Sequence, residues 1–235
     1  QINTANQCRR KWGFEKLDGI RGATTPAQQE GLDLHHVAEE WLEQGIEPDW
    51  DSKAGKLFKA GMRYLPARDD ALEIEHGFVF DDGPLRWRGF IDLVDPRPEV
   101  PRITDHKTTS SFYWLKSVRE LLTDPQSIIY GKYWLDKHGI DIVEAQWVYY
   151  LKKKNEAKEV VFRLEREHVE TEYEALRQTG HELLQLKQTY KSGLEIDVRG
   201  FPHAGCKAFG GCAFQGICRD LKYGKKDENS MNALM

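Results

Sequence analysis

The sequence of 235 residues predicts an α/β fold in which helices flank a mixed β-sheet. Three observations support this class: a helical pattern over 26–44, three consecutive strand patterns within 72–107, and a helix followed by a β-hairpin within 125–164. Helices that alternate with groups of strands cover the faces of one sheet, because each element must bury its apolar side.

The composition describes a folded chain with no membrane-spanning part. Apolar residues make up 40% of the chain and aromatic residues 11%, which is enough for a core. The formal net charge of −4 lacks the basic excess that announces nucleic-acid binding, although Lys and Arg cluster at 9–11 and 152–154. No apolar stretch reaches ~18 residues, and the first residues do not resemble a signal peptide. We therefore expect a cytoplasmic protein without membrane contact.

The first long helix has clear start and stop signals. Thr25 is the predicted N-cap, Pro26 fits the first helical position, and Gln28 completes a capping box. Gly45 ends the helix. A second helix is expected over about 52–65.

His35 lies beside the apolar stripe of the first long helix, one turn after Gly31. The glycine leaves space for a ligand to approach the imidazole. A single histidine on a helix is more often structural or exposed than a ligand, so the residue alone leaves both interpretations open.

Three strands are predicted at 72–80, 85–94 and 102–107, joined as a meander. In the first of them, apolar residues alternate with Glu73 and Glu75, which therefore point to the other face. These glutamates are within reach of a metal site, but a solvated face is the preferred interpretation.

The candidate chemistry lies on the second and third strands. Asp92 stands inside the apolar run FIDLV, where an unpaired carboxylate is costly. Asp105 ends the next apolar run, and Lys107 follows two residues later, so both side chains point to one face. A neighbouring strand can bring Asp92 opposite them, where two carboxylates favour a cation and a lysine can orient or deprotonate a water. This is the minimum for metal-dependent phosphodiester hydrolysis, and a hydrogen-bonded aspartate beside a surface lysine is the alternative.

Helices and a hairpin follow the third strand. Residues 111–123 show an apolar pattern typical of a helix. Asp124 is the predicted N-cap of the next helix, Gly139 ends it, and Gln126 and Tyr130 share one of its faces. The remaining predicted elements are strands at 142–151 and 158–164 and a long helix at 166–191.

Three of the four cysteines are clustered near the C-terminus. Cys206, Cys212 and Cys218 stand in a glycine-rich segment with five residues between neighbours, and Cys8 is the fourth. Four thiolates suit a metal centre, whereas disulfides are disfavoured without a secretory signal. Because the spacing exceeds the C-x₂₋₄-C usual for zinc, an iron–sulfur cluster is the preferred interpretation, with zinc and free thiols as alternatives.

Six motifs follow one another in a recognisable order along the chain. They are Cys8 in a basic and aromatic N-terminus, Gly31-x₃-His35, GFIDLVD with Asp92, ITDHKTT with Asp105 and Lys107, Gln126-x₃-Tyr130, and the three clustered cysteines. The order resembles the RecB-like branch of the PD-(D/E)XK nuclease superfamily. More narrowly, the chain is similar to iron–sulfur exonucleases that include CRISPR-associated and phage-borne relatives, over roughly residues 1–220. Each motif is weak alone, and the six together are strong.

This resemblance implies a catalytic metal site. His35, Asp92, Asp105 and the backbone carbonyl of His106 would bind Mg²⁺ or Mn²⁺. Lys107 would position or activate the attacking water.

Two further groups of residues receive roles from the resemblance. Gln126 and Tyr130 would order the active site and the DNA strand. Cys8, Cys206, Cys212 and Cys218 would hold a 4Fe–4S cluster, which joins the two ends of the chain. Relatives often have two residues between the first pair of C-terminal cysteines instead of five. This difference leaves open whether the cysteines bind an iron–sulfur cluster or zinc.

The resemblance also implies a single RecB-like nuclease domain over 1–222. Its core, a restriction-endonuclease-like α/β core, would span about 26–165. Residues 1–25 and 166–222 would form a helical region that carries the cluster. The polar segment 223–235 is predicted to be a disordered tail.

The implied activity is that of a metal-dependent deoxyribonuclease, an exonuclease acting on single-stranded DNA ends. Aromatic residues such as Tyr130 or Trp114 would stack on unpaired bases. Protein partners in recombination, repair or CRISPR adaptation would be compatible, but the sequence identifies none. The alternative is a catalytically silent nucleic-acid-binding or assembly module with a structural metal cluster. A redox enzyme is disfavoured because no dinucleotide-binding motif is present.

Overall fold

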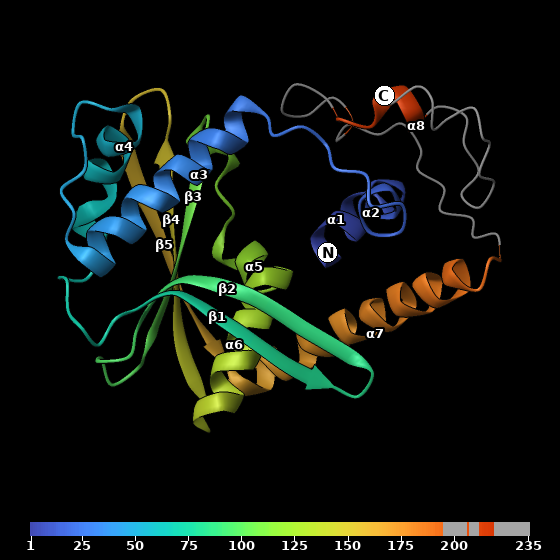
Figure 1. The fold of residues 1–235 in the computed structure, drawn as a ribbon. Coiled ribbons are helices and arrows are strands. Elements are labelled where there is room, and N and C mark those ends of the chain that lie inside the picture. Colours follow the sequence, from blue (N-terminus) through green and yellow to red (C-terminus); the bar gives the residue numbers. More distant parts are fainter. Residues whose placement is uncertain (195–205, 207–211, 219–235) are drawn as a thin grey trace. The chain divides into compact units, whose positions relative to one another are not determined.

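The computed structural model describes residues 1–194, 206 and 212–218, which form two compact units (Figure 1). The sheet unit is Thr25–Ala175, and the terminal unit combines Gln1–Thr24 with the described residues from Leu176 onward. The predicted nuclease core, 26–165, falls within the sheet unit, while the extent of a single domain over 1–222 stays a prediction. The predicted tail, 223–235, lies outside the described residues.

Five strands form one mixed sheet in the order β1-β2-β3-β4-β5. They are β1 (Glu73–Asp82), β2 (Leu85–Asp95), β3 (Arg102–Thr109), β4 (Ile142–Leu151) and β5 (Glu156–Glu165). β1, β2 and β3 pair as an antiparallel meander, β4 runs parallel to β3, and β5 returns antiparallel to β4. The predicted α/β class with a mixed sheet is confirmed. The parallel pair needs a long crossover, which the helices between β3 and β4 supply.

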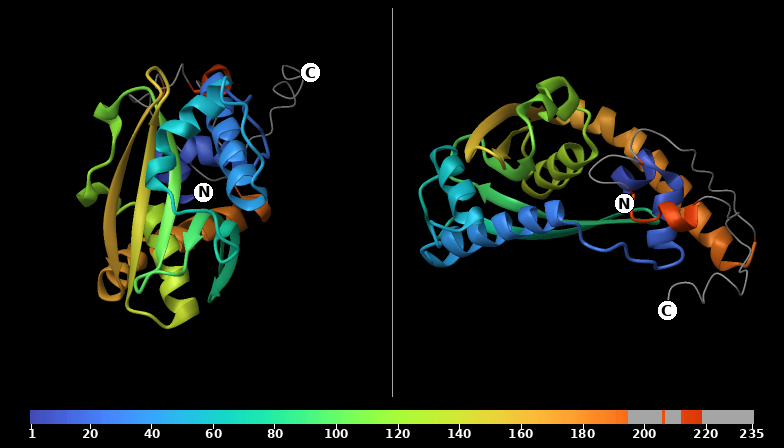
Figure 2. Two further views of the ribbon diagram at one scale, coloured as in Figure 1. Left: turned by 90° about the vertical axis from the view of Figure 1, so that its left-hand side faces the viewer. Right: turned by 90° about the horizontal axis from the view of Figure 1, so that it is seen from above.

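Helices cover both faces of the central strands in the sheet unit (Figure 2). They are α3 (Pro26–Glu39), which continues as a π-helical turn (Glu40–Gln44), α4 (Lys53–Gly61) with a 3₁₀ turn (Met62–Tyr64), α5 (Val118–Leu121), α6 (Pro125–His138) and the start of α7 (Arg166–Lys191). Val148 and Tyr150 of β4 pack with buried residues of α3 and α4, whereas Trp147 contacts the ring of Tyr130 on α6. Strand β4 is therefore buried on both sides, and α3 and α6 lie on opposite faces.

The predicted helix ends are confirmed by their capping contacts. The Thr25 hydroxyl accepts a hydrogen bond from the Gln28 backbone, and the Gln28 side chain accepts one from the Thr25 backbone. At α6 the Asp124 side chain accepts a hydrogen bond from the backbone N–H of Gln126. Gly45 and Gly139 end their helices with φ angles of 68° and 62°, a conformation that glycine adopts without steric cost.

The prediction of one helix over 111–123 is wrong. Phe112–Trp114 form a single 3₁₀ turn, Leu115 is extended with ψ of 132°, and only Val118–Leu121 are α-helical. The break has a local cause, because the hydroxyls of Ser111 and Ser117 each cap a separate turn. As a result Tyr113 and Trp114 are 83% and 68% exposed.

The terminal unit brings the N-terminal helices to the end of α7 and the cysteine segment. Its elements are α1 (Ile2–Gln7), α2 (Arg9–Lys16), the second part of α7 and α8 (Gln215–Cys218). Phe14 stacks on Phe214 with ring centroids 5.2 Å apart, and Trp12 packs against Leu183 of α7. Among the described helices, none combines the length and apolarity needed to cross a bilayer.

Candidate active site

Asp92 lies where β2 and β3 separate. The two strands pair regularly from Asp95 opposite Arg102 to Leu93 opposite Thr104. At the next position the Asp92 side chain takes the place of the backbone partner, since its Oδ2 accepts a hydrogen bond of 2.7 Å from the backbone N–H of His106. The regular pairing of β2 and β3 therefore ends at Asp92, whose carboxylate still connects the two strands by a hydrogen bond.

Asp105, Lys107 and Gln126 meet beside this opening, as the sequence predicts. Asp105 is fully buried, and its Oδ2 forms an ion pair with Lys107, whose side chain is 36% exposed. The Gln126 Nε2 donates to Asp105 Oδ1 at 2.7 Å and contacts the Tyr130 hydroxyl at 2.7 Å. The Tyr130 hydroxyl in turn donates to the backbone carbonyl of Phe90 on β2. A chain of hydrogen bonds thus connects Asp105 on β3 to Gln126 and Tyr130 on α6 and, through Tyr130, to the backbone of β2.

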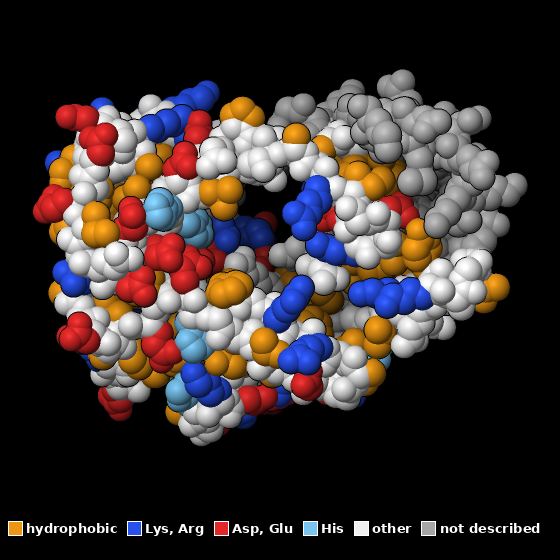
Figure 3. All heavy atoms as spheres, viewed as in Figure 1, with side chains coloured by type: hydrophobic (Ala, Val, Ile, Leu, Met, Phe, Trp, Pro, Cys, Tyr) orange, Lys and Arg blue, Asp and Glu red, His pale blue; other side chains and the backbone are white. Residues whose placement is uncertain are grey.

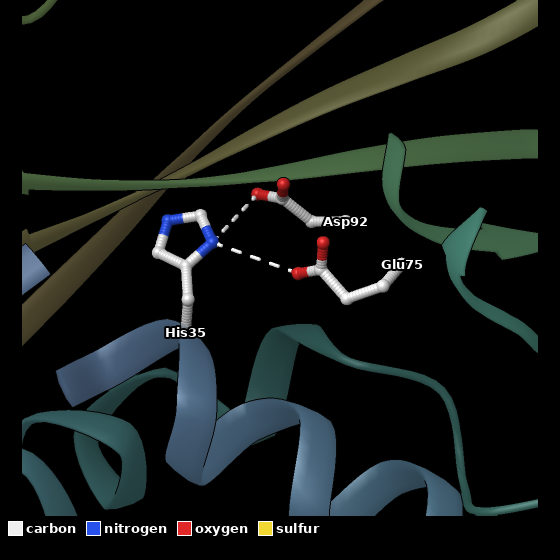
Figure 4. Close-up of side chains that lie close together, drawn as sticks. All are labelled: His35, Glu75 and Asp92. Atoms are coloured by element: carbon white, nitrogen blue, oxygen red, sulfur yellow. Dashed lines mark ion pairs between the residues drawn. The ribbon is translucent and has the colours of Figure 1, made fainter. Parts of the chain in front are cut away.

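His35 reaches the same place from α3 (Figure 4). Its Nδ1 is 3.5 Å from Asp92 Oδ2, and its Nε2 lies 3.0 Å from the backbone carbonyl oxygen of His106. The structure therefore brings His35 and the predicted His106 carbonyl together with Asp92. At Gly31, an added Cβ would lie 3.5 Å from Thr108 Oγ1, an ordinary contact, so packing within the protein does not require the glycine.

Glu75 belongs to this group, which corrects the expectation that it is merely solvated. His35, Glu75 and Asp92 each place one ligand atom within 4.8 Å of the others. Glu75 adopts a φ of 45° between the pairs Ile74–Leu93 and His76–Ile91, so it lies directly opposite Asp92. A non-glycine residue in this conformation costs about 1–3 kcal/mol, and such strain is concentrated at functional sites.

The sequence signal that could have identified Glu75 is its register with Asp92, which becomes visible only when the two strands are aligned. Glu73 instead pairs with His76.

The electrostatics of the site favour a bound cation. Burial, followed by the charge of Asp105, raises the pKa of Asp92 to about 7. Burial opposes the charged form of His35, but the carboxylates of Glu75, Asp92 and Asp105 outweigh it and raise its pKa to about 9. Burial likewise opposes the charge on Lys107, and Asp105 and Asp92 raise its pKa nevertheless. Crowded carboxylates with one imidazole are a donor set that fits Mg²⁺ or Mn²⁺.

Tyr130 cannot serve as a stacking surface for a base, contrary to one expectation from the sequence. Its side chain is only 6% exposed, because its ring packs against Phe78 and Trp147 while its hydroxyl bonds the Phe90 carbonyl. Trp114 is exposed and keeps this possibility.

All four cysteines belong to the terminal unit, and each is half-buried. Cys8 is the N-cap of α2, and its Sγ accepts a hydrogen bond from the Lys11 backbone at 3.4 Å. The backbone N–H of Cys212 donates to the carbonyl of Cys206 at 2.9 Å. Burial raises the pKa of the Cys218 thiol, and the other three cysteines add to this effect. The thiols are therefore close enough to influence one another, and their binding of a cluster stays a prediction.

Comparison with known proteins decides the family. A sequence model described as the PD-(D/E)XK nuclease superfamily matches residues 56–219, which include Asp92, Asp105 and Lys107. The chain belongs to the PD-(D/E)XK nuclease superfamily. As a member, it is a nuclease with a nucleic-acid substrate, and nucleases of this superfamily generally use divalent metals.

One solved structure agrees with the fold of this PD-(D/E)XK nuclease. A Eubacterium rectale protein named "Putative exonuclease" has a TM-score of 0.50 and 13% identity, covering 77% of this chain and 74% of that chain. A second protein, SSO0001, has a TM-score of 0.38 and 16% identity, over 89% of this chain and 93% of that chain. A search of curated proteins found no match.

Proposed function

We propose that this PD-(D/E)XK nuclease is a metal-dependent deoxyribonuclease of the RecB-like branch, which removes nucleotides from single-stranded DNA ends. The observation that carries the proposal is the contact of Asp105 with both Lys107 and Gln126, beside Asp92 at the opening between β2 and β3. A silent binding module has no need for this arrangement. The preference for single-stranded ends rests on the resemblance of the motifs.

The metal would be held by Asp92, Asp105, His35 and the His106 carbonyl, and Glu75 is added as a ligand candidate by its position. When bound, Mg²⁺ or Mn²⁺ supplies positive charge that stabilises the phosphate oxygens as the phosphodiester bond breaks.

The other residues act on water and on geometry. Lys107 is held by Asp105 yet partly exposed, so its ammonium can position or activate a water for attack on phosphorus. Gln126 is a positioning residue, since its amide fixes the orientation of Asp105 and is itself held by Tyr130.

The cysteines would form a separate structural centre. We infer that Cys8, Cys206, Cys212 and Cys218 bind a 4Fe–4S cluster, with zinc as the alternative. Their location in one compact unit and their mutual electrostatic influence support this assignment.

Metal removal tests the proposed activity directly. Purified protein is incubated with end-labelled single-stranded and double-stranded DNA, in Mg²⁺ or Mn²⁺ and in excess chelator. We expect mononucleotides or short products from single-stranded ends only when metal is present. Internal cleavage would replace the exonuclease assignment by an endonuclease. Absence of cleavage in either metal would favour the silent module.

His35→Ala is expected to weaken Mn²⁺ binding by roughly 10-fold or more while DNA binding changes little, because one ligand is lost. Isothermal titration of Mn²⁺ measures this directly. His36→Ala is the matched control, since His36 is the next residue on α3 and its side chain is 67% exposed beside Glu40. Equal Mn²⁺ affinity in the wild type and His35→Ala would make His35 structural.

A further inference from the structure

The solvent-facing side of β2 carries a row of residues that ends at the candidate metal site. Residues 85–93 alternate, with buried Leu85, Trp87, Ile91 and Leu93 on one face. Arg86, Arg88, Phe90 and Asp92 occupy the other face, because residues two apart in a strand point the same way. Figure 3 shows carboxylates and histidines near one end of the β1–β2 hairpin, with hydrophobic and basic side chains following along it. We call Arg86, Arg88 and Phe90 the β2 row.

Phe90 is an aromatic platform supported from below. Its side chain is 64% exposed, and it lies across from Gly77 of β1. A Cβ added to Gly77 would lie 3.2 Å from the Phe90 ring, which shows that the ring rests against the glycine backbone. One side of the ring is therefore held by β1, and much of the remainder is open to solvent.

The two arginines are available to bind an anion. Arg88 is exposed, and among the described residues its side chain has no ion pair or hydrogen bond. Arg86 is 72% exposed and lies 3.8 Å from Asp81, which is also mostly exposed. Such a surface pair contributes about 0–1 kcal/mol and is easily exchanged for a phosphate.

We propose that the β2 row binds an unpaired strand of nucleic acid and leads it to Asp92, with Phe90 stacked on a base and Arg88 and Arg86 on successive phosphates. Row positions are about 6.6–6.8 Å apart, a step similar to one nucleotide of an extended strand. A basic track with an aromatic stacking residue is the usual equipment for binding single strands. The inference rests on the proposed nuclease function and assigns the path of its substrate.

The experiment measures binding without cleavage. A fluorescein-labelled 12-nucleotide oligothymidylate is titrated in Mg²⁺ with full-length protein carrying Lys107→Ala, at several salt concentrations. Phe90→Leu, Phe90→Trp and Arg88→Gln are added singly to this background. Arg163→Gln is the matched control, because Arg163 is an exposed strand arginine on β5, an edge strand that is separated from β2 by β3 and β4. Circular dichroism checks that each variant folds.

Each substitution has a distinct expected signature. Phe90→Leu still covers Gly77 but loses the aromatic face, so affinity should fall about 5- to 150-fold with no change in salt dependence. Phe90→Trp should bind as tightly as the parent. Arg88→Gln should weaken binding and reduce the slope of log K against log salt by about 0.7, as one phosphate contact is lost. Arg163→Gln should change neither quantity.

Two results would overturn the proposal. One is parental affinity and salt slope in both Phe90→Leu and Arg88→Gln. The other is an equal loss in Arg163→Gln, which would show diffuse electrostatic attraction instead of a track. Cleavage by the wild-type protein is measured separately. If the wild-type protein cleaves DNA but the variants bind the oligonucleotide as tightly as the parent, the nuclease function stands and the binding track is wrong. If the variants lose affinity but the wild-type protein does not cleave DNA, the binding track stands on a protein that is not a nuclease.

Discussion

Replacing Lys107 by methionine is expected to lower the rate of DNA hydrolysis by about 10²- to 10⁴-fold, the usual contribution of a group that assists proton transfer. Divalent metal binding should not weaken. The Lys107 ammonium is the ion-pair partner of Asp105, so its removal leaves the carboxylates free of a competing cation. Rates under saturating Mn²⁺ and titration of Mn²⁺ binding separate the two effects.

The sequence offers a matched control for this substitution. Lys53 follows Asp51 at the same two-residue spacing, but it is 56% exposed at the start of α4 and pairs with Glu30. Lys53→Met should retain full hydrolysis. Asp105→Asn should lose both metal binding and hydrolysis, since the carboxylate is a ligand candidate. Unchanged hydrolysis in Lys107→Met would remove Lys107 from the catalytic site, and a joint loss of metal binding would make it a structural residue.

Local signals in the sequence were sufficient for most elements of the fold. The helix beginning after Thr25 and the helix beginning after Asp124 are set by capping side chains and a following proline, which act within three residues. The D-x-K spacing at Asp105 places two side chains on one face of any strand, so their contact needs no tertiary information.

The errors concern features that depend on distant or competing contacts. Glu75 joins His35 only because β1 and β2 are aligned with Glu75 opposite Asp92, and because its backbone adopts a φ of 45°. Tyr130 shares a helix face with Gln126 as predicted, but its burial follows from packing against β1 and β4. The apolar periodicity over 111–123 predicted one helix, but the hydroxyls of Ser111 and Ser117 cap two separate short turns instead.

The same limit applies to the substrate path. Alternation along β2 is readable from sequence, since Arg86, Arg88 and Phe90 are separated by apolar residues. Their role as a binding surface, however, depends on the neighbouring strand and on the packing of the opposite face of the hairpin. Gly77 supports the Phe90 ring only in the observed register, and the buried face of the hairpin packs against α6 through Phe78 and Tyr133.

Cys8→Ser is expected to abolish the metal centre of the terminal unit. The free energy of unfolding should fall by more than the usual effect of one substitution, which is about 0.5–3 kcal/mol, because the binding energy of such a centre contributes to folding. Serine is chosen because it removes the thiolate ligand while it preserves the cap of α2. Cys8 is the N-cap of α2 and accepts a hydrogen bond from the Lys11 backbone, and serine is a preferred residue in that role.

Cys8→Ser is tested by colour, metal content and urea unfolding of protein prepared without oxygen. We expect brown wild-type protein with a broad visible absorbance band, which Cys8→Ser loses together with solubility. Asp105→Asn is the control and should keep the colour while losing hydrolysis, because Asp105 belongs to the sheet unit and Cys8 to the terminal unit. Any folded Cys8→Ser protein should retain some nuclease activity for the same reason. Colourless wild-type protein with about one zinc per chain would establish a zinc centre. Stable wild-type protein with four free thiols and neither metal would contradict the metal centre and weaken the assignment to the iron–sulfur exonucleases.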